Sequence, residues 1–399
     1  MCRVDNAPRT PATFRVIMTT RPRVPFPGRG LALWGERLLQ AGLRAGAGCW
    51  SRLRQAGRRL EARDFRGTRC HCPPDLPRHF LHSEGLREAC DFVVDEGSNV
   101  RAPGRLSLPV RDLRRFAEGL GAGAAVHVKT DRLDEFVRHV LPVVTGPIVL
   151  VTGDSDSSLV RHHRALLDDP RIAHWFAQNC DLPGRHPRLT RVPIGLDNPV
   201  YTKLEKRLGF ALTMALGRTP WDPTISRNDM GDQALLQQVR AALPPPAQRP
   251  RRVLCTFHQN QKLIAPDIRN LPARAAAAAA LAVNPDCHFV SRRLPQDECW
   301  RRHEAFAFEA SPPGNGLDCF RTWEALLLGT IPLVPSTTLD PLYVNEQYPV
   351  VMINSWAEVT PANLERWAEE LQPRFTAGLE DRLALDYWVE KIKRASQAA

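Results

Sequence analysis

Three charged residues lie close together in a stretch of the chain that is otherwise apolar. Asp318, Arg321 and Glu324 follow one another at intervals of three residues, which places them on one face of a helix. They come directly after SPPGNG (residues 311–316), a run that continues neither a strand nor a helix. A helix that begins after a glycine-rich turn presents free N–H groups and the positive end of its dipole, which suit a phosphate. The pattern predicts that Arg321 clamps a diphosphate and that Glu324 accepts hydrogen bonds from ribose hydroxyls.

The same spacing has a second interpretation that needs no ligand. Arg321 and Glu324 can form an ion pair that satisfies both side chains beside the core. A glycine-rich turn before a helix is a weak motif, so spacing alone leaves both interpretations open. Asp318 adds a difficulty, because an acid near a phosphate is unfavourable unless it caps the helix.

The elements that must position these charges can be read from the surrounding residues. Phe306–Ala310 is a short apolar run, typical of a buried parallel strand. Leu317–Leu328 is rich in helix formers, and Gly329 fits the end of that helix. Ile331–Val334 then begins the next strand. The expected order is therefore strand, turn, helix and strand.

The sequence SPPGNGLDCFRTWEALLLGTIPLV (residues 311–334) resembles the signature of the exostosin-type glycosyltransferases, glycosyltransferase family 47. The residues that carry the resemblance are Arg321, Glu324, Ala325, Leu326, Ile331 and Pro332. Clear similarity covers about thirty residues, and weaker similarity extends over 126–392. Pro313 is a departure, since many relatives have a basic residue there.

The resemblance implies an α/β fold of the GT-B type, in which two Rossmann-like domains with parallel sheets face a cleft that C-terminal helices close. It implies transfer of a sugar from a nucleoside diphosphate donor, with uridine as the expected base, to a hydroxyl of a glycan or glycoconjugate. Such enzymes generally use no metal or other cofactor, and arginines and backbone N–H groups stabilise the leaving diphosphate instead. The predicted donor-binding residues are Ser311, Gly314, Asn315, Gly316, Arg321, Glu324 and Arg269.

Acidic residues after the strands of the first half are the candidates for the acceptor side. The predicted strands alternate with helices, including 133–141 and 159–167, as in a doubly wound parallel sheet. These strands are Cys90–Val94, Ala124–Val128, Pro147–Val151 and Leu189–Ile194. Ligands of such sheets bind at the carboxyl ends of strands. The polar residues expected there are Lys129, Asp131, Asp154, Asp156 and Asp197.

We predict that Asp154 or Asp156, and after them Asp131, is the base that takes the acceptor's proton. Three other interpretations of Asp154-x-Asp156 remain. The pair can hold a divalent metal, as in GT-A glycosyltransferases. Asp154 can be the nucleophile of a phosphatase. The Asp/Ser-rich turn can also simply cap a helix from Ser157.

Charge and composition limit the classes of function. The chain of 399 residues has a net charge of +11, but residues 1–60 hold twelve arginines against Asp5 and Glu36, a net of +10. The rest is close to neutral, which removes most support for a nucleic-acid partner. The sequence contains no run of 18 or more apolar residues, so no transmembrane segment is predicted.

Three regions are predicted from these patterns. Residues 1–75 form a basic, disordered extension, with an organelle-targeting peptide as the alternative. Residues 76–235 form the acceptor-side domain, and residues 236–399 the donor-binding domain, whose last helix crosses back to the first domain. Family resemblance is compatible with the Golgi or secretory pathway, and localisation stays open.

Two further possibilities concern the chain as a whole. Cys70-His71-Cys72 with His79, His82 and Cys90 supplies enough ligands for zinc, but the spacing matches no zinc module, so no metal site is predicted. The alternative to an enzyme is a catalytically silent carbohydrate- or nucleotide-binding protein on the same scaffold.

Overall fold

The computed structural model describes residues 79–94, 99–101, 108–109, 120–197, 233–257, 271–290 and 294–399. All of them belong to one unit, Asp64–Ala399. The predicted extension 1–75, the Cys70–Cys72 cluster and Arg269 lie outside the described residues.

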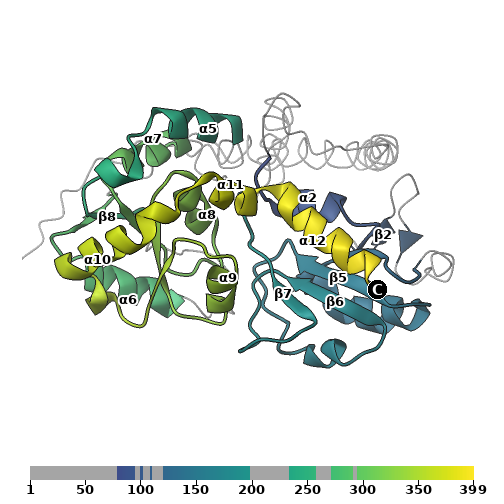
Figure 1. Cartoon of the computed structure of the whole chain (residues 1–399). Coiled ribbons are helices and arrows are strands. Elements are labelled where there is room, and N and C mark those ends of the chain that lie inside the picture. Colours follow the sequence, from purple (N-terminus) through teal and green to yellow (C-terminus); the bar gives the residue numbers. More distant parts are fainter. Residues whose placement is uncertain are drawn as a thin grey trace, which may run out of the picture. The chain divides into compact units, whose positions relative to one another are not determined.

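The first half of the described chain is built on a seven-stranded sheet in the order β3-β2-β1-β4-β5-β6-β7 (Figure 1). Strands β1, β4, β5, β6 and β7 run parallel, whereas β2 pairs antiparallel with β1 and β3. Every residue of β5 is buried, because both faces of a parallel sheet are covered. The strands are β1 Phe92–Val94, β2 Asn99–Arg101, β3 Leu108–Pro109, β4 Ala125–Lys129, β5 Ile148–Gly153, β6 Ile172–Ala177 and β7 Leu189–Arg191.

Short helices connect these strands. They are α2 Ser83–Glu88, η3 Thr130–Arg132, α3 Leu133–Glu135, the π-helix η4 Phe136–Val140, η5 Leu141–Val143 and η6 Arg164–Leu167. The predicted helix 133–141 is confirmed as the α3–η4 segment. The predicted helix 159–167 is wrong, because only η6 at its end is helical. Side chains satisfy the N–H groups ahead of η6 instead: Asp181 accepts from the Arg161 N–H, and the Ser155 hydroxyl accepts from the Ser157 N–H.

The second half is built on a five-stranded parallel sheet in the order β12-β11-β10-β8-β9. The chain passes from β8 outward to β9 and then returns to β10 on the other side of β8, so the direction of winding reverses between β8 and β10. Such a reversal is a topological switch point, where ligands of open α/β sheets bind. The strands are β8 Val253–Cys255, β9 Cys287–Phe289, β10 Phe308–Ala310, β11 Ile331–Pro335 and β12 Val351–Ile353.

Helices cover both faces of this second sheet. One apolar cluster joins the sheet to α6 and α10, and another joins its opposite side to α8 and α9 and continues into the first sheet. The halves therefore share a core. The helical elements are α5 Gln233–Ala242, η7 Pro246–Gln248, α6 Leu271–Leu281, α7 Gln296–Arg301, η8 Arg302–Ala305, α8 Phe320–Leu327, α9 Asp340–Asn345, η9 Trp356–Glu358, α10 Pro361–Leu371, η10 Gln372–Arg374, α11 Ala377–Leu383 and α12 Leu385–Gln397.

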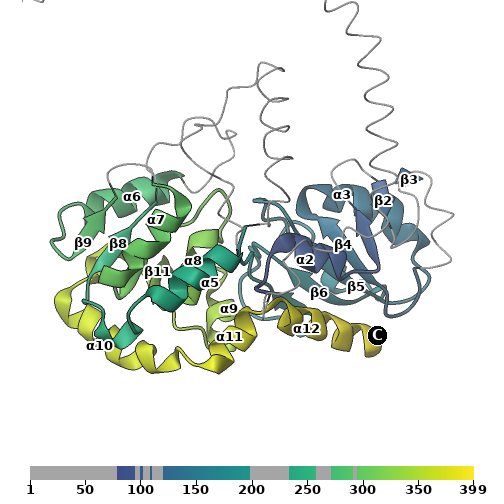
Figure 2. The same cartoon turned by 90° about the horizontal axis from the view of Figure 1, so that it is seen from above.

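The last helix leaves the second sheet and packs on the first. Helix α12 contacts α2, β4, β5 and β6, and Figures 1 and 2 show it lying beside α2. Its Trp388 is completely buried in the core of the first half. Lys391 and Tyr387 of α12 both bind the carboxylate of Glu346, at 2.5 Å each. Apolar packing and a buried acid thus hold the C-terminal helix in place.

In the described part of the chain, no helix is long and apolar enough to cross a bilayer.

Candidate functional site

Three side chains meet at the switch point of the second sheet. Thr256 follows β8, Glu309 lies on β10 and Arg321 lies on α8. The Arg321 Nε donates to Thr256 Oγ1 at 3.1 Å, and that hydroxyl donates to Glu309 Oε1 at 2.5 Å. The side chain of Arg321 is 16% exposed and that of Glu309 only 2%. One guanidinium is therefore held with partial solvent access at the place where a ligand is expected.

Glu309 does not neutralise this guanidinium at neutral pH. Burial raises the pKa of Glu309 to about 8, although the charge of Arg321 and the Thr256 hydroxyl act in the opposite direction. His303 lies 3.4 Å from Glu309 Oε2, but burial lowers the pKa of His303 to about 3, so this imidazole is neutral as well. Near pH 7 the positive charge of Arg321 is consequently available to an anion.

A second guanidinium comes from α6. Arg274 Nε donates to the carbonyl of Pro313 at 2.8 Å, within the glycine-rich turn. Burial, and after it the charge of Arg321, lower the pKa of Arg274 to about 10. The two arginines are thus close enough to repel each other, and an anion between them would relieve that repulsion. Sequence reasoning missed Arg274, because an arginine at the start of an alanine-rich helix carries no motif.

Glu324 lies one helical turn after Arg321 and is 7% exposed. Its Oε2 accepts from Gln296 Nε2 at 3.2 Å, and its Oε1 is buried. Burial raises the pKa of Glu324 to about 7, opposed first by the indole N–H of Trp300 and then by the charge of Arg321, and the nearby Asp197 raises it further. The carboxylate is thus enclosed between Trp300, Gln296 and Arg321.

The start of α8 differs from the prediction. The helix begins at Phe320, not Leu317, with Cys319 in an extended conformation as its N-cap and no side-chain cap. Asp318 therefore lies outside the helix and does not share its face with Arg321 and Glu324. The reason is long-range. Its carboxylate accepts hydrogen bonds from the Ile194 N–H of the first half, the Cys319 N–H and the Trp323 indole, at 2.8–2.9 Å.

Ser311 and Gly314, two of the predicted turn residues, are buried inside the turn. Ser311 is 3% exposed, and its hydroxyl bonds Thr322 Oγ1 at 2.9 Å inside the turn. A Cβ on Gly314 would lie 3.3 Å from Cys319 Cβ and at an ordinary contact distance of 3.5 Å from Arg274 Nη2. Ser311 thus shapes the turn from inside, and Gly314 adjoins the second guanidinium.

Gly316 and Asn315 join the turn to the first half. A Cβ on Gly316 would lie 2.7 Å from Asn179 Oδ1, so no side chain fits there. The same Asn179 oxygen accepts from the Asp318 N–H at 2.8 Å. Asn315 Nδ2 donates to Asp156 Oδ2 at 3.1 Å. The glycine-rich turn and the carboxyl-end loops of the first sheet are thereby in direct contact.

The three candidate bases have different surroundings. Asp154 has a positive φ of 54° and pairs with Arg87 Nη1 at 3.2 Å. Asp131 accepts from the hydroxyls of Ser155 (2.8 Å) and Ser157 and so braces the loop after β5. Asp156 is exposed, and Asn315 is the partner found for its carboxylate in the described chain. Of the three carboxylates, that of Asp156 is the least engaged in hydrogen bonds and ion pairs with described residues.

Two Rossmann-like sheets with five parallel strands each, contact between their carboxyl-end loops and a C-terminal helix that returns to the first sheet define an α/β fold of the GT-B type. No family model and no curated protein matches this chain.

Weak similarity is found to solved structures. One is a UDP-forming α,α-trehalose-phosphate synthase from Burkholderia vietnamiensis, at 11% identity over 73% of this chain and 79% of that chain, with a TM-score of 0.37. Another is Anabaena Alr3699/HepE in complex with UDP-glucose, at 12% identity over 75% and 83%, with a TM-score of 0.36. A third is the GtfA/B complex, at 11% identity and a TM-score of 0.29; the match covers 76% of this chain and 64% of that one.

The hydrogen bonds of Asp318 generate a stability prediction. Asp318→Ala leaves the N–H groups of Ile194, Cys319 and Trp323 without their acceptor in a buried region. Each unsatisfied buried donor costs about 1–3 kcal/mol, so we expect the free energy of unfolding to fall by at least ~3 kcal/mol. Urea unfolding followed by circular dichroism measures the change. Asp168→Ala, at an exposed position, is the control. A loss below ~1 kcal/mol would contradict this account.

Proposed function

We propose that this protein is a glycosyltransferase that transfers a sugar from a nucleoside diphosphate donor to a hydroxyl of a glycan or glycoconjugate. The observation that carries the proposal is the partly exposed Arg321 at the switch point of the second sheet, beside a Glu309 that burial keeps protonated. The resemblance of residues 311–334 to the exostosin signature supports the finer hypothesis of an exostosin-type enzyme with a uridine diphosphate donor.

The diphosphate would bind between Arg321 and Arg274, at the N-terminus of α8. The described hydrogen bonds of Arg321 use its Nε and Nη1 and leave Nη2 for a ligand. Two guanidiniums and a helix N-terminus without a side-chain cap stabilise the negative charge that develops as the bond to the sugar breaks. Arg274 reaches the turn from α6 and supplies a basic group there, although Pro313 occupies the position that is basic in many exostosins.

Glu324 is suited to the ribose. A carboxylate can accept a hydrogen bond from a hydroxyl group, and the Glu324 carboxylate lies one helical turn after the guanidinium of Arg321. Arg321 and Glu324 would then contact neighbouring parts of one nucleotide, with a spacing of three residues along α8.

The acceptor side is assigned to the loop after β5. In an inverting transfer, a base removes the proton from the acceptor hydroxyl while its oxygen forms the new bond to the sugar and the diphosphate leaves. Asp156 is exposed and hydrogen-bonded to Asn315 of the glycine-rich turn, so its carboxylate adjoins the proposed donor site. Asp154 is the weaker candidate, because Arg87 already binds its carboxylate. The same ion pair weakens the phosphatase alternative, which needs Asp154 as a free nucleophile.

Nucleotide binding is the first test. We expect Arg321→Gln to weaken UDP binding about 10- to 100-fold, because a hydrogen bond to a charged group contributes about 1.5–3 kcal/mol. Calorimetry with UDP, GDP, ADP and CDP measures the effect and the base preference. Arg366→Gln on α10, an exposed arginine paired with Glu370, is the matched control and should bind normally. Equal affinities of wild type and Arg321→Gln would refute the donor site.

The raised pKa of Glu309 generates a pH prediction. Below about pH 8 the carboxyl is protonated, and above it the carboxylate places a negative charge beside the diphosphate. UDP affinity should therefore fall as pH rises from 7 to 9, by about 3- to 10-fold, since a like charge a few ångströms away costs about 1–4 kcal/mol and the protonated fraction falls about tenfold over this range. Glu309→Gln should abolish this fall, because glutamine stays neutral.

Glu304 is exposed in the neighbouring η8, so Glu304→Gln is the control. Its UDP affinity should depend on pH as that of the wild type does. A wild-type affinity that does not change between these pH values would show that Glu309 lies away from the bound diphosphate.

Turnover tests the acceptor side. We expect Asp156→Asn to lower sugar transfer by at least ~100-fold while UDP affinity stays within a factor of ~2, because only the proton acceptor is lost. Single-turnover release of UDP from a UDP-sugar measures the step, with Asp168→Asn as the control. Near-normal transfer by Asp156→Asn would move the base to another residue. A wild-type protein that binds UDP but transfers none of a panel of sugars would be the catalytically silent alternative.

A further inference from the structure

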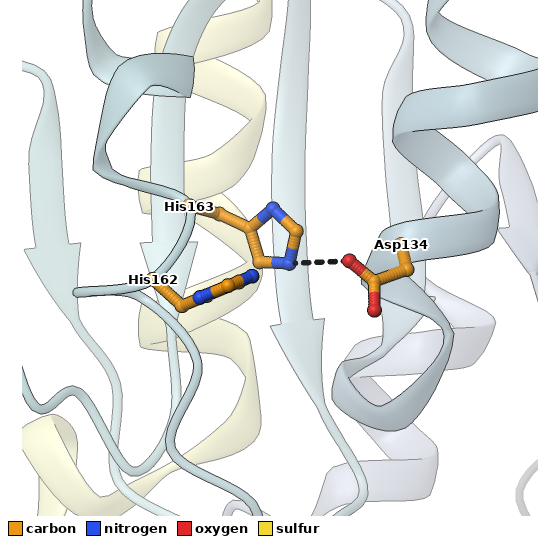
Figure 3. A group of neighbouring side chains, drawn as sticks. All are labelled: Asp134, His162 and His163. Carbon is orange, nitrogen blue, oxygen red and sulfur yellow. Dashed lines mark ion pairs between the residues drawn. The ribbon is translucent and has the colours of Figure 1, made fainter.

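A group of metal-binding side chains lies outside the proposed donor and acceptor site. Asp134 of α3 faces His162 and His163, which lie in the turn before η6 (Figure 3). Asp134 Oδ1 is 3.1 Å from His163 Nε2. One ligand atom from each residue lies within 4.8 Å of the other two. The two imidazole rings are nearly perpendicular, at 86° with centroids 4.7 Å apart.

The nitrogen at the centre of this group lacks a hydrogen bond. The side chain of His163 is 10% exposed, and its Nε2 is buried without a hydrogen-bond partner in the described structure, although Asp134 is close. Imidazole nitrogens and carboxylate oxygens are common ligands of transition-metal ions in proteins.

We propose that Asp134, His162 and His163 bind a divalent transition-metal ion, with zinc as the expected metal and water completing the coordination. Two imidazoles and one carboxylate suit zinc, whereas calcium and magnesium prefer oxygen ligands throughout. Tetrahedral zinc with bonds of 2.0–2.1 Å places its ligand atoms about 3.3 Å apart. The Asp134–His163 distance already fits, and the exposed side chains of Asp134 and His162 are able to close the remaining gap.

The position of the group suggests what a bound ion would do. Asp131, one turn before Asp134, already binds Ser155 and Ser157 at the start of the loop after β5. A metal ion on Asp134, His162 and His163 would attach the other end of that loop to α3, which directly follows the η3 turn that contains Asp131. The ion would thus act as a structural brace on the loop that contains Asp156. This inference rests on the group itself and does not depend on the proposed transfer activity.

Metal titration of the full chain tests the proposal. Competition with a chromophoric chelator measures zinc affinity, and cobalt(II) absorption reports the ligand type. Cysteine ligands produce an intense near-ultraviolet charge-transfer band, whereas a site of two imidazoles and a carboxylate produces only the weak visible bands. This readout separates the group from the ten cysteines of the chain. We expect one zinc equivalent whose cobalt spectrum lacks the thiolate band.

Variants at the exposed ligands avoid the risk of unfolding that His163→Ala carries. Asp134→Asn and His162→Ala should each weaken zinc binding at least ~10-fold, as loss of a ligand costs no less than loss of an outer-shell partner. His139→Ala, an exposed histidine of the neighbouring η4, is the control and should bind normally. Zinc should also slow amide hydrogen exchange in residues 155–163 of the wild type but not of Asp134→Asn. Absence of zinc binding, or equal affinity in Asp134→Asn and His162→Ala, would overturn the proposal.

Discussion

The hydrogen bonds of the Asp318 carboxylate are the interaction on which the start of α8, and with it the candidate site, depends. The carboxylate accepts hydrogen bonds from the Ile194 N–H at the end of the first sheet, from the N–H at the N-cap of α8 and from the indole N–H of Trp323. Burial raises its pKa to about 7, whereas these donors favour the ionised form. One buried acid thereby sets where α8 begins and which side of that helix faces the first half. The positions of Arg321 and Glu324 follow from that start.

The electrostatics of the switch point follow from burial more than from ion pairing. Glu309 lies within 3.9 Å of the Arg321 Nε, and an exposed acid at that distance would neutralise the arginine. Enclosed in the sheet, Glu309 holds its proton near neutral pH and serves as a neutral partner of the Thr256 hydroxyl. The arginine is therefore oriented without losing its charge. Removing water from one acid thus leaves the positive charge of Arg321 at the switch point, where we propose that the diphosphate binds.

The loop after β5 illustrates how several weak contacts define one functional segment. Asp131 binds its serines, Asn179 binds the carbonyl of Ser155, and Asn315 binds Asp156 from the second half. The Asp134–His162–His163 group lies at the far end of the same loop. Each contact is modest in energy and partly exposed, so the loop is adjustable. This combination of fixed ends and an adjustable centre is compatible with the acceptor-side role that we propose for the loop.

Local sequence determined the strand–turn–helix–strand unit, the end of α8 at Gly329 and the shared face of Arg321 and Glu324, because these depend on periodicity and on residues a few positions apart. It did not reveal Glu309 or Arg274, and it placed Asp318 inside a helix. Those three roles depend on contacts between residues far apart in the chain, such as Thr256 with Arg321 and Ile194 with Asp318. Strand order decided them by bringing β8 beside β10. A sequence pattern contains the spacing of charges, but burial and long-range neighbours decide which of them stay charged.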